Sequence, residues 1–248
     1  LNDIDVACYI SGAEAPSDVG KLLDYLADRL RSAFPNFKPD QIQPQTYSVT
    51  VSFRGTGLDV DVVPILYRGD SDWYGSLVSQ DDGSFLETCI PRHLEFIRKR
   101  KEAHERDFAQ VVRLAKFWAR KMKRETETFR LKSFMVELVL AKLADDGHAF
   151  SDYPEALQHF FTYLASTGLR KRIVFPDYYR ASEVGEFSER IQIIDPVNAK
   201  NNVSMLYTCA QAEAIVEAAL DAGDAIDSAL AAPTKHETVY YWQKVFGP

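Results

Sequence analysis

The sequence predicts an α+β fold in which a β-rich N-terminal third precedes a longer helical region. The strand prediction depends on three segments of that third, which alternate apolar and polar residues with a period of two. The helix prediction depends on a change of period near Pro91, after which apolar residues follow the i, i+3, i+4, i+7 rule. The 248 residues, 46% of them hydrophobic, suffice for one large core or two smaller ones and exclude a disordered protein.

In the N-terminal third, the alternating segments predict strands at residues 3–10, 47–53 and 58–65. Between the first two, leucines from Leu22 to Leu30 recur at helical spacing, behind a candidate cap at Ser17 or Asp18. The expected order of this third is therefore β-α-β-β.

The helical region begins with a segment, 92–124, that we expect to form one long helix. Its apolar stripe consists of Phe108, Val111, Val112, Ala115, Trp118, Ala119 and Met122. The same segment holds twelve Lys and Arg residues, so its other face is strongly basic and mostly solvated. Further helices are predicted at 133–143, 153–166 and 210–231, with an extended segment at 190–194. The helix at 133–143 is apolar nearly all round and is expected to be buried.

Composition excludes several classes of protein. The 29 basic and 36 acidic residues give a net charge of −7, so binding to nucleic acid or to an anionic membrane through the overall charge is not expected. No apolar run approaches the ~20 residues of a membrane span, and the first residues lack the charged-then-apolar pattern of a leader, so we expect no targeting segment among them. Cys8, Cys89 and Cys209 form no CxxC pair, which argues against disulfides and Cys-rich zinc sites. We therefore expect a cytoplasmic protein.

Two predicted strands carry paired carboxylates. Residues i and i+2 of a strand share a face, so Asp3 lies with Asp5 and Asp59 lies with Asp61. Such pairs suit hard cations such as Mg²⁺, which prefer oxygen ligands. The chain has three Asp-x-Asp matches, about the number that chance gives, so the motif alone carries little weight. Its apolar surroundings make a functional role and a structural role about equally favoured.

Two further features suggest anion binding. Lys116 lies at the edge of the apolar stripe, where its side chain could turn into a cleft while its basic neighbours stay solvated. Ser133 is a candidate N-cap, and a helix N-terminus beside Lys132 binds phosphate readily. The alternative is a plain cap with Phe134 in the core.

Other chemistries have little support. The chain contains no P-loop, no GxGxxG and no GxSxG, and its five histidines show no HExxH spacing. A Ser/His/Asp or Cys/His site stays open, because such residues meet only in the fold.

Taken together, these motifs resemble the oligoadenylate synthase and cyclic GMP-AMP synthase branch of the polymerase-β-like nucleotidyltransferases. The matching segments are Asp3-x-Asp5, 58–64 (LDVDVVP), 113–118 (RLAKFW) and Lys132–Ser133–Phe134. Two more, 195–203 (DPVNAKNNV) and 242–247 (WQKVFG), look like the bacterial members, the CD-NTases of antiphage cyclic-oligonucleotide signalling. The resemblance extends over nearly the whole chain in one order.

The resemblance implies a two-lobed fold with the active site in the cleft. Residues 1–91 would form the nucleotidyltransferase core, a mixed sheet with helices, and 92–248 the helical domain. In the family a Gly-Ser turn that holds the donor phosphates, and an N-terminal helix, precede the first carboxylate pair. This sequence begins two residues before Asp3, so we expect both to lie outside it.

The resemblance also implies the metal ligands. Asp3, Asp5 and Asp61 would be the catalytic carboxylates that hold two Mg²⁺ ions, for which Mn²⁺ is a substitute. Asp61 is preferred to Asp59 because it carries the family's Asp-Val-x-Pro match.

For nucleotide binding, the resemblance implies that Lys116 and Ser133 contact the donor triphosphate, with Lys132 beside them. Phe134 takes the family's aromatic position, which stacks on a nucleobase and is more often Tyr.

The function implied is Mg²⁺-dependent joining of nucleoside triphosphates into a cyclic di- or trinucleotide second messenger, with release of pyrophosphate. The alternatives are a linear 2′-5′ oligoadenylate-type synthase, another nucleotidyl-adding enzyme, or a catalytically inactive nucleotide-binding scaffold. The expected partners are ATP, other nucleoside triphosphates and a HORMA-like activating protein. Duplex-DNA sensing is not expected, because the zinc-binding insertion of the animal sensor is absent and the chain is acidic.

Overall fold

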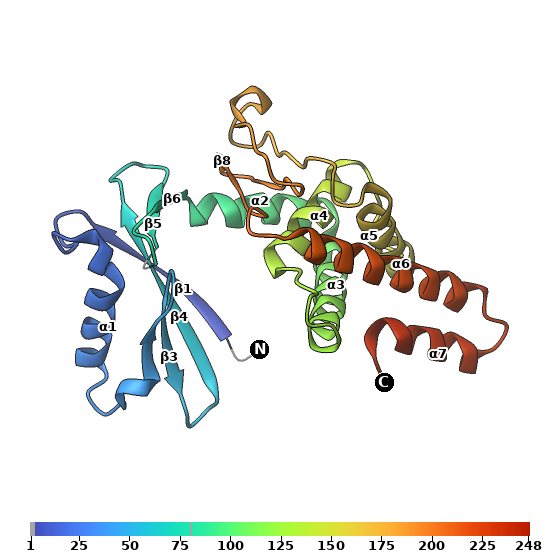
Figure 1. The fold of residues 1–248 in the computed structure, drawn as a ribbon, viewed down its shortest axis with the longest axis horizontal. Coiled ribbons are helices and arrows are strands. Elements are labelled where there is room, and N and C mark those ends of the chain that lie inside the picture. Colours follow the sequence, from blue (N-terminus) through green and yellow to red (C-terminus); the bar gives the residue numbers. More distant parts are fainter. Residues whose placement is uncertain (1–2, 80) are drawn as a thin grey trace. The chain divides into compact units, whose positions relative to one another are not determined.

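The structure, a computed structural model, describes residues 3–79 and 81–248, except for the side chain of Asp3. The chain divides into two compact units, Leu1–His93 and Leu94–Pro248 (Figure 1). The boundary expected from the sequence, between residues 91 and 92, falls within the helix that begins at Ile90. Each unit is described below by itself.

The first unit is a mixed sheet with one covering helix, α1 (Leu22–Ala33) (Figure 1). The strand order is β2-β3-β4-β5-β6, with β1 on the free edge of β4. β1 runs parallel to β4, and the other neighbours are antiparallel. The strands are β1 (Asp3–Ser11), β2 (Ile42–Pro44), β3 (Val49–Phe53), β4 (Leu58–Tyr67), β5 (Gly75–Val78) and β6 (Phe85–Thr88). The three predicted strands are present, and β2, β5 and β6 are additional.

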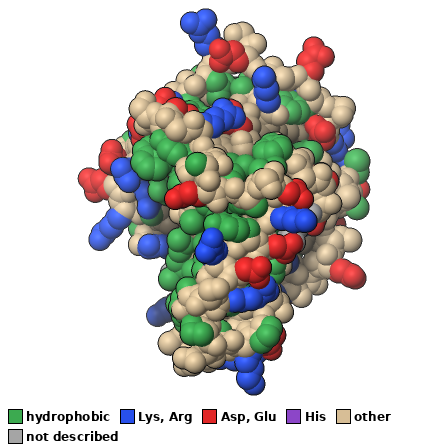
Figure 2. Space-filling model, turned by 90° about the vertical axis from the view of Figure 1, so that its left-hand side faces the viewer, with side chains coloured by type: hydrophobic (Ala, Val, Ile, Leu, Met, Phe, Trp, Pro, Cys, Tyr) green, Lys and Arg blue, Asp and Glu red, His purple; other side chains and the backbone are tan. Residues whose placement is uncertain are grey.

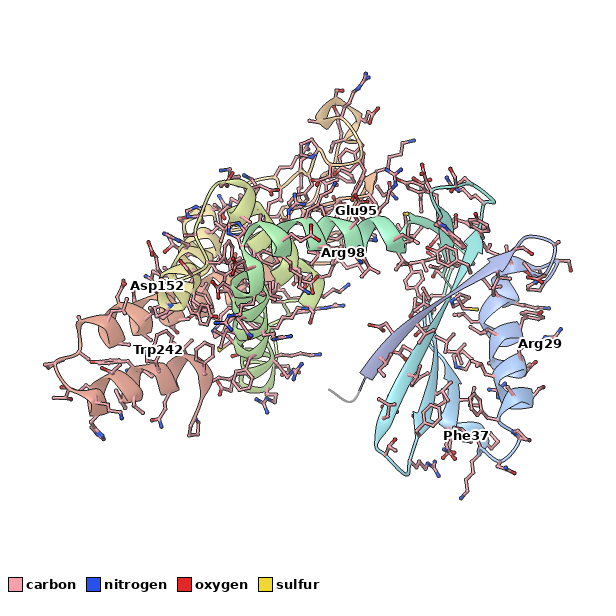
Figure 3. All side chains as sticks on the ribbon, turned by 180° about the vertical axis from the view of Figure 1, so that it is seen from behind. Arg29, Phe37, Glu95, Arg98, Asp152 and Trp242 are labelled. Carbon is pink, nitrogen blue, oxygen red and sulfur yellow. The ribbon has the colours of Figure 1, made fainter. Side chains whose placement is uncertain are left out.

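The two faces of this sheet differ in chemistry. Alternate residues of β3, together with β2 and the inner face of α1, form an apolar cluster made of Leu23, Leu26, Ala27, Ile42, Val49 and Val51, and Val60 and Val62 of β4 pack against it. Phe37 packs against that cluster, whereas Arg29 lies on the side of α1 turned away from the sheet (Figure 3). The residues between the apolar ones therefore fall on the opposite face, which is the polar face of the sheet.

The second unit is helical around one large core. Its helices are α2 (Ile90–Ala103), which begins in the first unit, α3 (Glu105–Glu125), α4 (Ser133–Asp145), α5 (Tyr153–Thr167), α6 (Cys209–Ala231) and α7 (Lys235–Phe246). Seven of the thirteen residues of α4 are buried, as its uniform apolarity predicts. Trp118 of α3 contacts the rings of Phe129, Phe160 and Phe161 at the centre of the core.

The prediction of one long helix over 92–124 is wrong, because the structure has two helices there, α2 and α3. The break lies at His104, and Glu105 has a φ of 49°, in the left-handed region that interrupts a right-handed helix. The His104 ring packs on Phe150, which also contacts Phe108 of α3. A tertiary contact thus accompanies the break.

One member of the basic segment is not solvated. Arg100 is buried, with its guanidinium over the Phe96 ring, and it donates hydrogen bonds to Asp145 at 2.6 Å and to Asp177 at 3.0 and 3.1 Å. These bonds tie the end of α2 to α4 and to the segment after α5. Arg100 is therefore a structural ion-pair residue of the helical core.

The motif at 195–203 forms a hairpin of β7 (Ile194–Asp195) and β8 (Asn198–Asn202). Asp195 is buried and accepts hydrogen bonds from the Val197 amide and the Asn201 side chain. In the closing motif, Trp242 of α7 stacks on Phe246 (Figure 3). Both motifs therefore have structural contacts inside the helical unit.

The surface agrees with the composition. Figure 2 shows Lys and Arg interspersed with Asp and Glu over one face, without a continuous basic field. Cys8, Cys89 and Cys209 are free thiols. Among the described helices, none is both long enough and apolar enough to cross a bilayer.

Candidate functional site

The described carboxylates, those of Asp5, Asp59 and Asp61, lie on the polar face of the sheet, on two neighbouring strands. β1 and β4 pair in register, so that Asp5 is directly opposite Asp61 and the backbone position of Asp3 is opposite Asp59. Adjacent strands are about 4.8 Å apart. Two distant Asp-x-Asp motifs therefore meet side by side, which the sequence pattern could not show.

Asp61 differs from its neighbours in burial and in partner. Asp5 and Asp59 are exposed, whereas Asp61 is half-buried. Its Oδ1 accepts a hydrogen bond of 2.5 Å from the hydroxyl of Thr50, the residue paired with it on β3. Thr50 was not predicted from the sequence, because antiparallel register is not visible in the pattern of one strand.

These carboxylates suit a divalent metal. Like charges placed directly opposite each other across strands destabilise a sheet, and a bound cation relieves the repulsion. The donor atoms are carboxylate oxygens, the ligands that hard cations prefer. The described side chains, which do not include that of Asp3, form no ready-made cluster of three or more His, Cys, Asp or Glu ligands.

Lys116 lies in the second unit and has a partner. On α3 its ammonium donates a hydrogen bond to Glu137 of α4, and both side chains are about one quarter exposed. Lys116 is therefore a half-buried, ion-paired residue that differs from the solvated members of the basic segment. Glu137 was missed, although it is the only charged residue among the first nine of α4.

The start of α4 shows that Ser133 is not the N-cap that the sequence predicted. The N-cap of α4 is Lys132, and Ser133 is the first helical residue, with no side-chain cap bond. Lys132 donates its backbone N–H to the Tyr207 hydroxyl at 2.9 Å, and this bond holds the chain in its extended approach to the helix. Ser133 lies one turn before Glu137, so both project from the same side of α4.

The electrostatics here suit an anion. Partial desolvation, and to a lesser degree the positive charge of Arg130, lower the pKa of the Lys132 ammonium, although the side chain stays largely exposed. An anion would relieve the repulsion between the two cations. Phe134 is half-buried and packs against the helical core.

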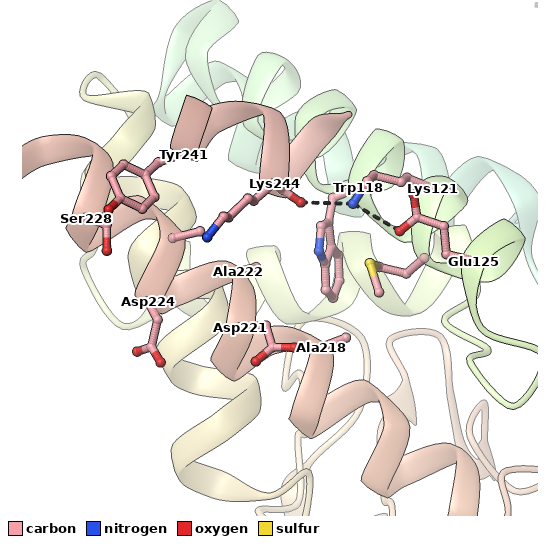
Figure 4. Close-up of a pocket in the computed structure, with 12 residues that line it drawn as sticks. Trp118, Lys121, Glu125, Ala218, Asp221, Ala222, Asp224, Ser228, Tyr241 and Lys244 are labelled. Atoms are coloured by element: carbon pink, nitrogen blue, oxygen red, sulfur yellow. Dashed lines mark hydrogen bonds and ion pairs between the residues drawn. The ribbon is translucent and has the colours of Figure 1, made fainter. Parts of the chain in front are cut away.

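A separate cavity of about 480 Å³ opens between α3, α6 and α7 (Figure 4). Lys121 closes one side through its ion pair with Glu125 and a hydrogen bond to the Lys244 carbonyl. At 100° per residue, the residues of α3 that line it, such as Trp118, lie on the opposite side of the helix from Lys116. None of the predicted site residues lines this cavity.

Known proteins that are similar to this chain in sequence and in structure identify its family. Over 247 residues, the whole chain is 68% identical to a cyclic AMP-AMP-AMP synthase from Escherichia coli strain MS 115-1, and it spans 77% of that protein. This chain belongs to the CD-NTase family. The structure of CdnC from E. coli MS115-1 with ATP matches with a TM-score of 0.91 at 68% identity, covering 100% of this chain and 78% of that one.

More distant CD-NTases share the fold. A CBASS oligonucleotide cyclase CdnC from E. coli strain KTE188 is 34% identical, over 88% of this chain and 67% of its own length. The GTP-bound DncV of Vibrio cholerae has a TM-score of 0.68 at 15% identity, over 99% of this chain and 62% of that one. The chain matches no protein-family model.

The predicted identity is thereby confirmed. This CD-NTase is a nucleotidyltransferase of the CBASS type, a cyclic oligonucleotide synthase with a polymerase-β-like fold. Nucleotidyl transfer by CD-NTases is metal-dependent. The roles of individual residues and the number and kind of metal ions remain predictions.

Proposed function

We propose that this CD-NTase joins AMP units from ATP into cyclic AMP-AMP-AMP, using Asp3, Asp5 and Asp61 as its catalytic carboxylates. The observation that carries the proposal is the register of β1 and β4, which pairs the two Asp-x-Asp motifs on one polar face. The 68% identity to a cyclic AMP-AMP-AMP synthase, over the full chain, supports the choice of product.

Each transfer makes one phosphodiester bond and breaks one phosphoanhydride bond. The acceptor ribose hydroxyl loses its proton and attacks the α-phosphorus of ATP, while pyrophosphate leaves from the opposite side. Asp61 accepts the proton or passes it to water. Two Mg²⁺ ions, when bound by the carboxylates, would lower the pKa of the acceptor hydroxyl and stabilise the leaving pyrophosphate. Ring closure repeats the same transfer within the linear product.

The helical unit supplies the nucleotide contacts in this proposal. Lys116 and Lys132 offset triphosphate charge, and Ser133 donates its hydroxyl or backbone N–H to a phosphate oxygen. Phe134 stacks on adenine, which any nucleobase face permits. Glu137 holds the Lys116 ammonium in place while the site is empty.

A HORMA-type protein is the proposed partner. The MS115-1 relative is known as a complex with HORMA-deltaN, and that structure matches this chain with a TM-score of 0.90 at 67% identity.

Product analysis tests the proposal. The natural protein that carries this chain is incubated with each ribonucleoside triphosphate and Mg²⁺, and phosphatase-treated products are analysed by mass spectrometry. We expect a phosphatase-resistant product from ATP alone, with the mass of cyclic AMP-AMP-AMP. A linear product would instead favour the oligoadenylate-type alternative, and a requirement for GTP would overturn the choice of substrate.

A further inference from the structure

On the polar face of the sheet, the side chain of Thr50 hydrogen-bonds to Asp61 and not to Asp59, the other aspartate on the same strand. Its hydroxyl donates to Oδ1 of Asp61 at 2.5 Å across the β3–β4 pair. The next pair along these strands, Ser52 and Asp59, has the same register, yet no such bond joins its side chains in the described part of the chain. The hydrogen bond therefore distinguishes Asp61 from Asp59.

The hydrogen bond restricts how the carboxylate can turn. A β-branched side chain in a strand has few χ1 choices, so the Thr50 hydroxyl is a stiff donor. Because Thr50 satisfies Oδ1, the second oxygen, Oδ2, is left to face a metal or a proton. A carboxylate that binds metal commonly has such a partner, whose loss costs about 10–100-fold in metal affinity or activity.

We infer that Thr50 is a positioning residue for nucleotidyl transfer, acting through Asp61 to hold that carboxylate in its reactive orientation. This inference rests on the proposed function, in which Asp61 is a catalytic carboxylate. Thr50 touches neither substrate nor metal in this account. Its removal should therefore lower the rate of the chemical step and leave ATP binding unchanged.

Thr50→Val is the decisive variant. Valine has nearly the same shape, suits a strand and lacks the hydroxyl, so the fold should survive. Thr50→Ser restores the hydroxyl on a smaller side chain. The matched control is Thr46→Val, which removes a second Thr–Asp side-chain hydrogen bond, from Thr46 to Asp81.

The measurement is kcat and KM for ATP, together with the Mn²⁺ concentration that gives half the maximal rate. We expect Thr50→Val to lower kcat about tenfold or more, to leave KM within twofold, and to raise the Mn²⁺ requirement. Thr50→Ser should retain most of the activity, and Thr46→Val should equal the parent protein. Thermal melting should give the same midpoint for all of them.

Two results would overturn the inference: a Thr50→Val enzyme with unchanged kcat, or a Thr50→Ser enzyme as impaired as Thr50→Val. Failure of the proposed function would look different. In that case Asp61→Asn, measured beside them, would still form the cyclic product.

Discussion

Lys116 and Glu137 form an ion pair whose two side chains are less exposed than the solvated charged residues of the basic segment. Both are partly buried and bonded to each other, whereas Arg113 on the same helix is exposed and bonds to the half-buried Gln110. Burial strengthens the interaction of an ammonium with any anion, because screening by water is reduced. Lys116 is therefore better suited than the exposed Arg113 to bind triphosphate.

Lys116→Ala should raise KM for ATP about tenfold, since a hydrogen bond to a charged group is worth about 1.5–3 kcal/mol. The value of kcat should change little, because the lost contact binds substrate and transition state alike. Steady-state kinetics measure both. The control is Lys142→Ala, which removes an α4 ion pair of similar exposure, with Asp146. An unchanged KM in Lys116→Ala would return Lys116 to a structural role.

At the residue scale, the sequence predicted side chains whose partners are near in the chain. Asp-x-Asp pairs on a strand, and Lys132 beside Ser133, follow from local periodicity alone. Thr50 and Glu137 could not be found this way, because each acts on a residue of another element. Their roles depend on strand register and helix packing, which are long-range properties of the fold.

At the element scale, two glycines differ in the space beside them. A Cβ at Gly223, inside α6, would meet its nearest atom at 3.7 Å, on Gln158, which is an ordinary contact. A Cβ at Gly75, in β5, would lie 2.4 Å from the Ile65 side chain and 2.7 Å from the Leu66 carbonyl. β5 therefore requires glycine at position 75, whereas α6 tolerates the methyl group of alanine at position 223.

Gly223→Ala should therefore stabilise the protein by about 0.5–1 kcal/mol, because alanine loses less backbone entropy in a helix. Gly75→Ala should destabilise it by about 1–3 kcal/mol through overpacking. Urea unfolding of the two variants measures both effects, each variant serving as the other's control. Destabilisation by Gly223→Ala would mean that α5 and α6 pack more closely than the structure has them.

Elements with strong internal periodicity were predictable and short ones were not. β1, β3 and β4 alternate clearly, and α4 is uniformly apolar. β2, β5 and β6 have only three or four residues each, so their pairing depends on neighbouring strands. The break between α2 and α3 was missed because the residues around it suit a helix, while a ring contact with Phe150 accompanies the turn.

At the scale of the whole molecule, the sheet unit offers carboxylates and the helical unit offers cations. In the proposed function, the carboxylates of the sheet unit hold the metal ions, and Lys116 and Lys132 of the helical unit bind the triphosphate. Collinear motifs identified the family from the sequence. Which side chains lie together in each motif could be known only from the register of the strands and from the start of α4.

We propose that Asp61, held by Thr50 opposite Asp5, is a catalytic carboxylate, and that Asp59 on the same strand is not. The most direct measurement is the rate of cyclic product formation by Asp61→Asn and by Asp59→Asn, both checked for an unchanged fold by circular dichroism. We predict that Asp61→Asn abolishes product formation and that Asp59→Asn keeps the parent rate within a few-fold. Turnover by Asp61→Asn, or loss of activity confined to Asp59→Asn, would show that Asp61 is not the catalytic carboxylate of β4.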